Sequence, residues 1–336
     1  MKVRVLFRGP LSIASLLIVA LAGCGRPGVE LTAEEKSRLE ERSIDFLTRA
    51  SQADDPIVRA NAIESLVKFA PEQSRPQFLA AADADLPVVR YAGLLALGQI
   101  RDHKSLGPIR RRLVDQDSRV RMAAAFAAYR CGDVNTAGPI LDSALRDNPD
   151  EKLRGETAWL IGRLGDTTAI ARLRKVADRD SSGLVVTYAQ SAMALLGDQA
   201  MIDRLIEYTL KSDVETRLIA LQTLVETPEP RARKALLYRL NDASDYLATR
   251  LLAARALGAT GDGSGYKLAY ESLGYRNSEP VEMMRVRSMA ALALGAVGDP
   301  RALGALRTVA ESDTDPRTQV AACDAILQII RRPRPR

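Results

Sequence analysis

The chain has 336 residues, of which 27% are charged and 4% are aromatic, and its formal net charge is +6 with one histidine and three cysteines. The excess positive charge lies at the ends: without the three basic residues of positions 1–23 and the four of positions 331–336, residues 24–330 carry a net charge of −1. A near-neutral body has no overall positive field to attract phosphates, so we expect no nucleic-acid partner.

The first 23 residues have the pattern of an export signal. Basic residues come first, at Lys2, Arg4 and Arg8, and positions 11–22 then contain no charge. Twelve helical residues span about 18 Å, which is too short to cross a hydrocarbon core of about 30 Å. A cleaved signal peptide is therefore favoured over a membrane span.

The apolar stretch ends in Leu21-Ala22-Gly23-Cys24, which resembles the lipobox of bacterial lipoproteins. The resemblance implies that residues 1–23 are removed and that Cys24 becomes the lipidated first residue. The alternative is an ordinary signal that happens to contain a cysteine. With lipid on Cys24, residues 24–31 form a tether of at most about 25 Å that holds the folded part close to a membrane outside the cytoplasm. Because Gly25 and not Asp follows the cysteine, the resemblance favours the periplasmic face of an outer membrane.

A repeated segment occupies the rest of the chain. It reads Asp-x-x-Val-Arg, then small residues, then Ala-Leu-Gly-x-x-Gly-Asp, with variations. Its anchor positions are separated by 31, 31, 33, 32, 31, 33, 37 and 32 residues: Arg59, Arg90, Arg121, Arg154, Val186, Arg217, Arg250, Arg287 and Gln319. Each repeat is long enough for two short helices, and one such unit cannot bury its own apolar face, so the units must stack.

Turn and capping residues define the ends of the expected helices. The first helix begins at Thr32, which with Glu35 matches a capping box. The second helix of several units begins after an aspartate, as at Asp55, Asp117 and Asp315, because its carboxylate caps free amide groups. Five glycines follow the anchor by eleven residues and suit the left-handed turn that ends a helix: Gly132, Gly165, Gly197, Gly261 and Gly298.

This pattern resembles HEAT repeats, in particular the short repeats of phycobilisome-lyase-like HEAT proteins. The resemblance implies a right-handed all-α solenoid of about nine stacked helical hairpins over residues 32–330. It also implies a ladder of Asp and Arg side chains between neighbouring units, which is in doubt at Val186 and Gln319. In a solenoid each unit contacts only its neighbours, so we expect no disulfide between Cys131 and Cys323.

Two segments depart from the repeat. The interval of 37 residues places an excess of about five in 274–280, where Gly274 and Pro280 bracket polar residues, so we expect a loop there and not an extra helical turn. The last six residues, 331–336, alternate arginine with proline after two arginines, and we expect a disordered basic tail.

The sequence offers no evident catalytic machinery. Its single histidine, His103, lies in a turn, and the two cysteines of the body are far apart, which is a poor supply of zinc ligands. HEAT-fold hydroxylases with iron centres use repeated His-Glu pairs, and this chain has none. We therefore predict a protein that is not an enzyme, with no cofactor, no metal and no small-molecule substrate.

A candidate binding face lies on the second helices of units two to four. At 100° per residue, the first and fifth positions after the anchor point away from the predicted core. In these units they are apolar or aromatic, and arginines follow at the ninth position: Tyr91, Leu95, Met122, Phe126, Trp159, Arg130 and Arg163. An exposed aromatic strip with an arginine rim is typical of a binding site. The alternative is that curvature tucks these side chains between neighbouring helices.

We therefore predict a membrane-anchored lipoprotein that binds a protein partner on the concave face of the solenoid as a scaffold or adaptor. The alternatives are a lyase-like enzyme of the resembled class and a chaperone-like factor that acts on a bound protein.

Overall fold

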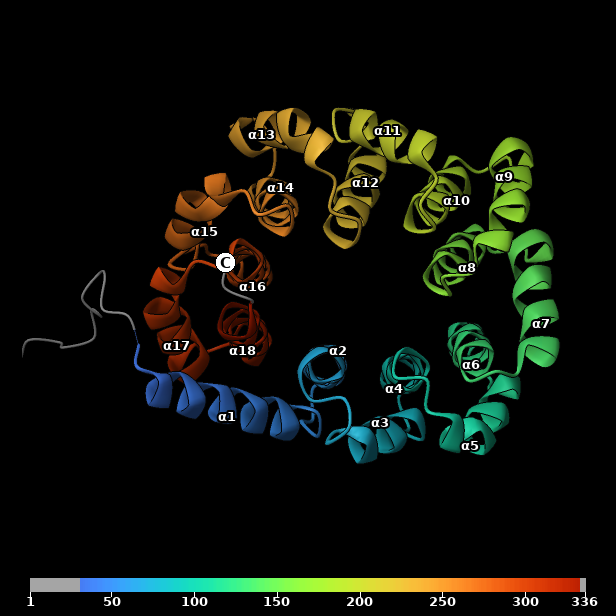
Figure 1. The fold of residues 1–336 in the computed structure, drawn as a ribbon, viewed down its shortest axis with the longest axis horizontal. Helices are drawn as coiled ribbons and strands as arrows, with labels where there is room; N and C mark the ends of the chain where they lie inside the picture. Colours follow the sequence, from blue (N-terminus) through green and yellow to red (C-terminus); the bar gives the residue numbers. More distant parts are fainter. Residues whose placement is uncertain (1–30, 333–336) are drawn as a thin grey trace, which may run out of the picture.

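The computed structural model describes residues 31–332, and within this range the chain forms α-helices, short 3₁₀ turns and no strand. The 18 α-helices pair into nine hairpins, which confirms the predicted all-α solenoid. The first helix of each hairpin lies outside and the second lies inside (Figure 1). No helix within residues 31–332 has both the length and the apolar content needed to cross a membrane.

The outer helices are α1 (Ala33–Ala50), α3 (Arg75–Ala82), α5 (Leu106–Arg111), α7 (Val134–Asp147), α9 (Ile170–Arg179), α11 (Gln199–Tyr208), α13 (Arg233–Asn241), α15 (Tyr266–Ser272) and α17 (Leu303–Ser312). The inner helices are α2 (Pro56–Phe69), α4 (Pro87–Gln99), α6 (Ser118–Arg130), α8 (Glu151–Arg163), α10 (Gly183–Leu195), α12 (Val214–Glu226), α14 (Leu247–Ala259), α16 (Pro280–Val297) and α18 (Pro316–Arg331).

The predicted helix ends are confirmed. Thr32 and Glu35 form the capping box of α1, and Asp55, Asp117 and Asp315 accept backbone amides at the starts of α2, α6 and α18. The five glycines that follow the anchors have φ between +75° and +93°, a region that glycine enters without the steric cost of a Cβ. Local sequence therefore sets the ends of these helices.

Four Arg–Asp rungs join units two to three, four to five, six to seven and eight to nine. Each rung links an anchor arginine to an aspartate in the next unit, between its outer and inner helices: Arg90 to Asp115 at 2.9 Å, Arg154 to Asp180 at 2.8 Å, Arg217 to Asp245 at 2.9 Å, and Arg287 to Asp313. In all four rungs the arginine also donates to one or more carbonyls of its own hairpin loop, as Arg90 does to Ala84 and Asp85. Val186 and Gln319 lack a guanidinium, so no rung forms at these units. Arg59, Arg121 and Arg250 keep the guanidinium but form no ion pair within residues 31–332, and Arg121 and Arg250 donate only to backbone carbonyls.

The solenoid closes into a ring. The last helix, α18, packs against α1 and α2, and Figure 1 shows the blue and red ends of the chain side by side. Val320, Cys323 and Leu327 of α18 belong to the same buried core as Leu47 of α1. The expectation that each unit contacts only its neighbours in sequence is therefore wrong for the first and last units. Cys131 and Cys323 are free and buried.

Polar contacts at the end of α18 involve residues predicted to be disordered. Arg331 ends α18, and its Nε donates to Glu40 of α1 at 2.8 Å. Arg332 donates to the carbonyl of Ala296 at 2.9 Å. The predicted start of the tail at residue 331 is thus wrong, because Arg331 belongs to α18 and pairs with a carboxylate of α1, and Arg332 donates to a carbonyl near the end of α16. Positions 333–336, and the predicted signal and lipobox in 1–30, lie outside the described residues.

The extra residues of unit eight form a helical turn. The other inner helices begin three residues before their anchor, whereas α16 begins at Pro280, seven residues before Arg287. The four additional residues make about one turn at 3.6 residues per turn. The prediction of a loop holds for residues 274–279, but the prediction that the excess adds no helical turn is wrong. Pro280 occupies the first helical position, where its missing N–H has no partner in any case.

Candidate ligand cavity on the inner face

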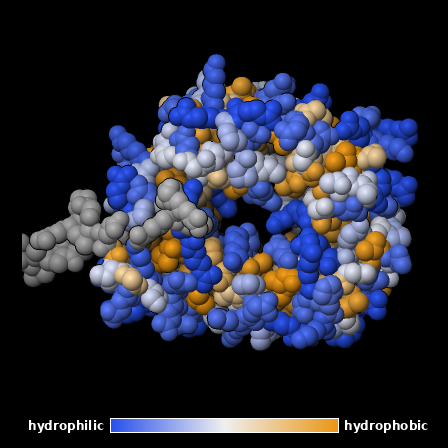
Figure 2. Space-filling model, viewed as in Figure 1, coloured by the Kyte–Doolittle hydropathy of each residue, from blue (hydrophilic) through white to orange (hydrophobic). Residues whose placement is uncertain are grey.

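The concave side of the ring contains a cavity of about 850 Å³. Its walls come from the inner helices α2, α4, α8, α10 and α12 and from the start of α6. The space-filling view shows the ring hollowed at its centre (Figure 2). A volume of this size lies in the range of sites that hold small ligands or the side chains of a bound segment.

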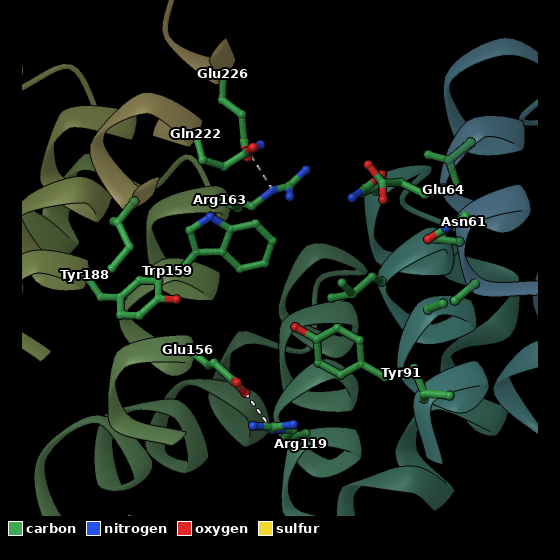
Figure 3. Close-up of a pocket in the computed structure, with 18 of the residues that line it drawn as sticks. Asn61, Glu64, Tyr91, Arg119, Glu156, Trp159, Arg163, Tyr188, Gln222 and Glu226 are labelled. Atoms are coloured by element: carbon green, nitrogen blue, oxygen red, sulfur yellow. Dashed lines mark ion pairs between the residues drawn. The ribbon is translucent and has the colours of Figure 1, made fainter. Parts of the chain in front are cut away.

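Three aromatic side chains surround the cavity: Tyr91 from α4, Trp159 from α8 and Tyr188 from α10 (Figure 3). The guanidinium of Arg163 lies 4.5 Å from the centre of the Trp159 ring, a distance suited to a cation–π contact. Gly155 makes room for Tyr188, because a Cβ on this glycine would lie 2.6 Å from Cδ2 of the tyrosine ring. Small residues on α8 thus let the aromatic ring of α10 lie against it.

Two ion pairs cross between inner helices within the cavity (Figure 3). Arg119 of α6 contacts Glu156 of α8 at 3.0 Å, and Arg163 of α8 contacts Glu226 of α12 at 3.8 Å. Burial raises the pKa of Glu156 above its usual value, although Arg119 opposes this shift. Burial also raises the pKa values of Tyr91 and Tyr188, so both phenols stay protonated donors at neutral pH.

Amide side chains supply further hydrogen-bonding groups. Asn61 of α2, Gln99 of α4 and Gln222 of α12 line the cavity from three sides. Each amide offers both donors and an acceptor, as a peptide backbone also does. The cavity therefore combines aromatic surface with groups able to pair with main-chain amides.

The predicted strip is only partly present. Tyr91, Leu95, Trp159 and Arg163 line the cavity, whereas Met122 and Phe126 are buried at 6% and 1% exposure. The prediction that these two side chains are exposed is wrong. Phe126 packs against α4 at Gly98, where a Cβ would lie 2.9 Å from the phenyl ring. The curvature of the stack tucks them between helices, as the alternative interpretation held.

Arg130 does not form a rim of the cavity either. Its Nε donates to the carbonyl of Gly98 at 3.3 Å, and a terminal nitrogen donates to the carbonyl of Leu164 at 3.2 Å. Both acceptors lie near the carboxyl ends of neighbouring inner helices, where carbonyls lack helical partners. The side chain thus joins three adjacent units.

The second position after the anchor was not predicted from the sequence to belong to a binding site. Residues at this position line the cavity: Asn61, Ala92, Glu156, Tyr188 and Ile219. So do three residues at the ninth position: Gln99, Arg163 and Glu226. Positions two, five and nine are separated by three and four residues, so they share one helix face. Following this face from the second position would have found Glu156 and Tyr188.

Chemistry-bearing groups are sparse among the described residues. Within residues 31–332 no group of three or more His, Cys, Asp or Glu side chains is arranged to hold a metal ion. The Nδ1 atom of His103 lies 3.0 Å from the carbonyl oxygen of Cys131, at the join between two units.

The protein is thus a closed ring of α-helical hairpins with a cavity on its inner face. The chain contains HEAT repeats at residues 44–129 and 138–217, and a PBS lyase HEAT-like repeat at residues 286–312. These assignments support the resemblance drawn from the repeat pattern. No curated protein sequence matches the chain.

Several solved structures are similar in fold. Human deoxyhypusine hydroxylase is 18% identical, with 87% of this chain and 98% of that chain covered, at a TM-score of 0.38. The CpcE–CpcF complex of phycocyanin lyase from Nostoc sp. PCC7120 is 21% identical, with 80% and 97% covered, at a TM-score of 0.41. Kap121p is 11% identical, with 84% and 37% covered, at a TM-score of 0.35.

Proposed function

We propose that this protein is a binding scaffold whose inner face holds an extended segment of a partner protein. The observation that carries the proposal is the cavity itself, where Tyr91, Trp159 and Tyr188 surround a volume of about 850 Å³. Aromatic side chains contribute strongly to protein recognition because they bury large areas with little loss of conformational entropy.

An extended segment suits the polar groups of the cavity. Asn61, Gln99 and Gln222 come from separate helices and face a common space. Extended peptides present unpaired main-chain amides along their length, and amide side chains can pair with them. The aromatic rings then accept the side chains of the bound segment. Binding, and not catalysis, is therefore the activity we propose for this site.

We further propose that the ring is held at a membrane outside the cytoplasm through lipid on Cys24. The support for this proposal is the order of basic start, apolar run and Leu-Ala-Gly-Cys at positions 21–24. A short tether keeps the scaffold beside the membrane, where an exported partner would be captured.

Trp159→Ala tests the binding proposal. Trp159 is partly exposed at the edge of the core, so its truncation should lower the melting temperature by a few degrees only. If it anchors a partner, capture should fall about tenfold or more. The measurement is the amount of partner that co-purifies with the protein from membranes, compared with the melting temperature of each variant.

Two variants serve as controls. Tyr238→Ala removes an aromatic side chain that is 61% exposed on the outer helix α13, and it should leave capture unchanged. Phe126→Ala opens the core between α4 and α6 and should cost about 3–5 kcal/mol of stability. Undiminished capture by Trp159→Ala, or a loss that merely follows the unfolded fraction, would refute the role of the cavity.

A further inference from the structure

A second concave site lies on the outside of the ring, between the outer helices α7 and α9. It is a groove of about 670 Å³ whose floor includes the buried side chains of Leu145 and Val176. Arg154, at the start of the inner helix α8, closes one end. The groove shares no residue with the inner cavity, so it is an independent site.

The groove is strongly basic. Its lining contains five basic and two acidic side chains, an excess of three positive charges: Arg146, Arg154, Arg172, Lys175 and Arg179 against Asp142 and Asp180. This excess stands out because residues 24–330 as a whole carry a net charge of −1. Cations gathered in a concave wall repel one another and focus a positive field.

Two of the arginines are held in place by the acids. Arg154 donates to both carboxylate oxygens of Asp180, at 2.8 and 2.9 Å. Arg172 donates to both oxygens of Asp142, at 2.7 and 2.8 Å. These contacts fix the guanidinium groups before any ligand arrives, which lowers the entropy lost on binding.

The other three cations form no ion pair among residues 31–332. Arg146 donates only to the backbone carbonyl of Asp142, within its own helix, at 3.2 Å. Lys175 and Arg179 follow Arg172 on α9 by three and seven residues, so the three share one helix face, which looks into the groove. The positive charges of Arg146, Lys175 and Arg179 are thus not neutralised by ion pairs within residues 31–332 and can attract an anion.

We propose that this groove binds a small ligand that carries two or more phosphate groups. Guanidinium and ammonium groups are the side chains that recognise phosphate most directly, through charge-assisted hydrogen bonds. Three uncompensated cations match the charge of a diphosphate better than that of a single carboxylate. The basic side chains come from α7, α8 and α9 and line one groove, which suits a compact ligand and not an extended nucleic-acid backbone. The diphosphate chemistry is shared by soluble phosphorylated compounds and by lipid headgroups.

Lys175→Ala combined with Arg179→Ala tests the site. Both side chains are exposed on α9, so their removal should not unfold the protein. The probe is inorganic pyrophosphate, and its binding is measured by titration calorimetry at low salt. Loss of each cation should weaken pyrophosphate binding roughly tenfold. Lys104→Ala combined with Lys211→Ala removes the same charge at exposed positions outside the groove and should leave affinity nearly unchanged.

A second arm identifies the source of the ligand. Sedimentation with vesicles that contain cardiolipin, which has two phosphates, is compared with sedimentation with neutral vesicles. Groove-dependent binding to cardiolipin vesicles supports a headgroup, and groove-dependent binding to pyrophosphate alone supports a soluble ligand. The proposal is overturned if neither probe binds, or if the Lys175/Arg179 double variant binds as tightly as the parent or the Lys104/Lys211 control.

Discussion

A buried aspartate, Asp324, connects the last unit of the ring to the first, and its replacement tests how the ring closes. Asp324 lies on α18 and is 1% exposed. Its Oδ2 accepts a hydrogen bond from Ser65 Oγ at 2.8 Å and contacts Lys68 Nζ at 3.2 Å, and both donors lie on α2. Asp324→Ala therefore removes a charged connection between the last unit and the first.

The structure sets the size of the expected effect. Breaking a fully buried ion pair costs about 3–5 kcal/mol. Lys68 is 36% exposed and retains Glu64 as a partner at 3.4 Å, so we expect a smaller cost of about 2 kcal/mol, which includes the unpaired Ser65 hydroxyl. About 1.4 kcal/mol corresponds to a tenfold change in an equilibrium constant, so the equilibrium constant for local opening of the seam should rise roughly 30-fold.

Hydrogen exchange followed by mass spectrometry locates the change. In Asp324→Ala, amides of α1, α2 and α18 should exchange faster, while α6 to α10 should keep the protection of the parent protein, because repeat stability is set by near neighbours. The control is Asp245→Ala, which breaks a similarly buried contact to Arg217 and Arg239 inside the stack. It should loosen α12 to α14 instead. Unchanged exchange at α1, α2 and α18, or an equal rise around the ring, would refute this account of the seam.

The remaining predictions concern the anchor, the ladder and the thiols. Cys24→Ala should abolish incorporation of labelled lipid and release the protein from the membrane or leave it unprocessed; incorporation that persists would contradict the proposed anchor. Hydrogen bonds from Arg154 hold the pKa of Asp180 below its usual value, so this rung stabilises the fold fully above about pH 4 and is lost as pH falls through the lowered pKa. The melting-temperature difference between the parent and Asp180→Asn should accordingly shrink from pH 6 to pH 3, and a constant difference would argue against the rung. Burial raises the pKa of Cys131 to about 11 and that of Cys323 to about 12, so neither thiol should react with a thiol reagent at pH 8 until the protein is unfolded.

The sequence predicted those features that depend on short stretches of chain. Asp55 caps α2 and Gly132 adopts a left-handed conformation, because a cap or a turn depends on a few neighbouring residues. Four rungs of the ladder agree with the resemblance, and the missing rung at Val186 follows from the missing guanidinium, whereas Arg121 keeps its guanidinium and still forms no ion pair within residues 31–332. The helical hairpin therefore could be recognised from the repeat alone.

Closure of the ring could not be predicted in this way. It results from small rotations summed over nine units, and no single repeat encodes the sum. Asp324 stands at a position assigned to the exposed face, but α2 covers it. Phe126 was assigned to the same face, and its burial depends on Gly98 in the neighbouring unit. Lys175 and Arg179 could not be predicted from the pattern of the inner helices, because they lie on the outer helix α9.

The inner cavity as a binding site for a protein partner is the central claim, and site-specific photo-crosslinking in the producing cell tests it most directly. Asn61 lines the cavity and is exposed, so the fold should tolerate p-benzoylphenylalanine in its place. This residue should then crosslink to a partner bound in the cavity. The same group in place of Tyr238 reports on the outer surface. We predict a discrete crosslinked partner from position 61 that is absent from position 238 and is lost when Trp159→Ala is added. A partner crosslinked equally from position 238, or no crosslink from position 61, would contradict the claim.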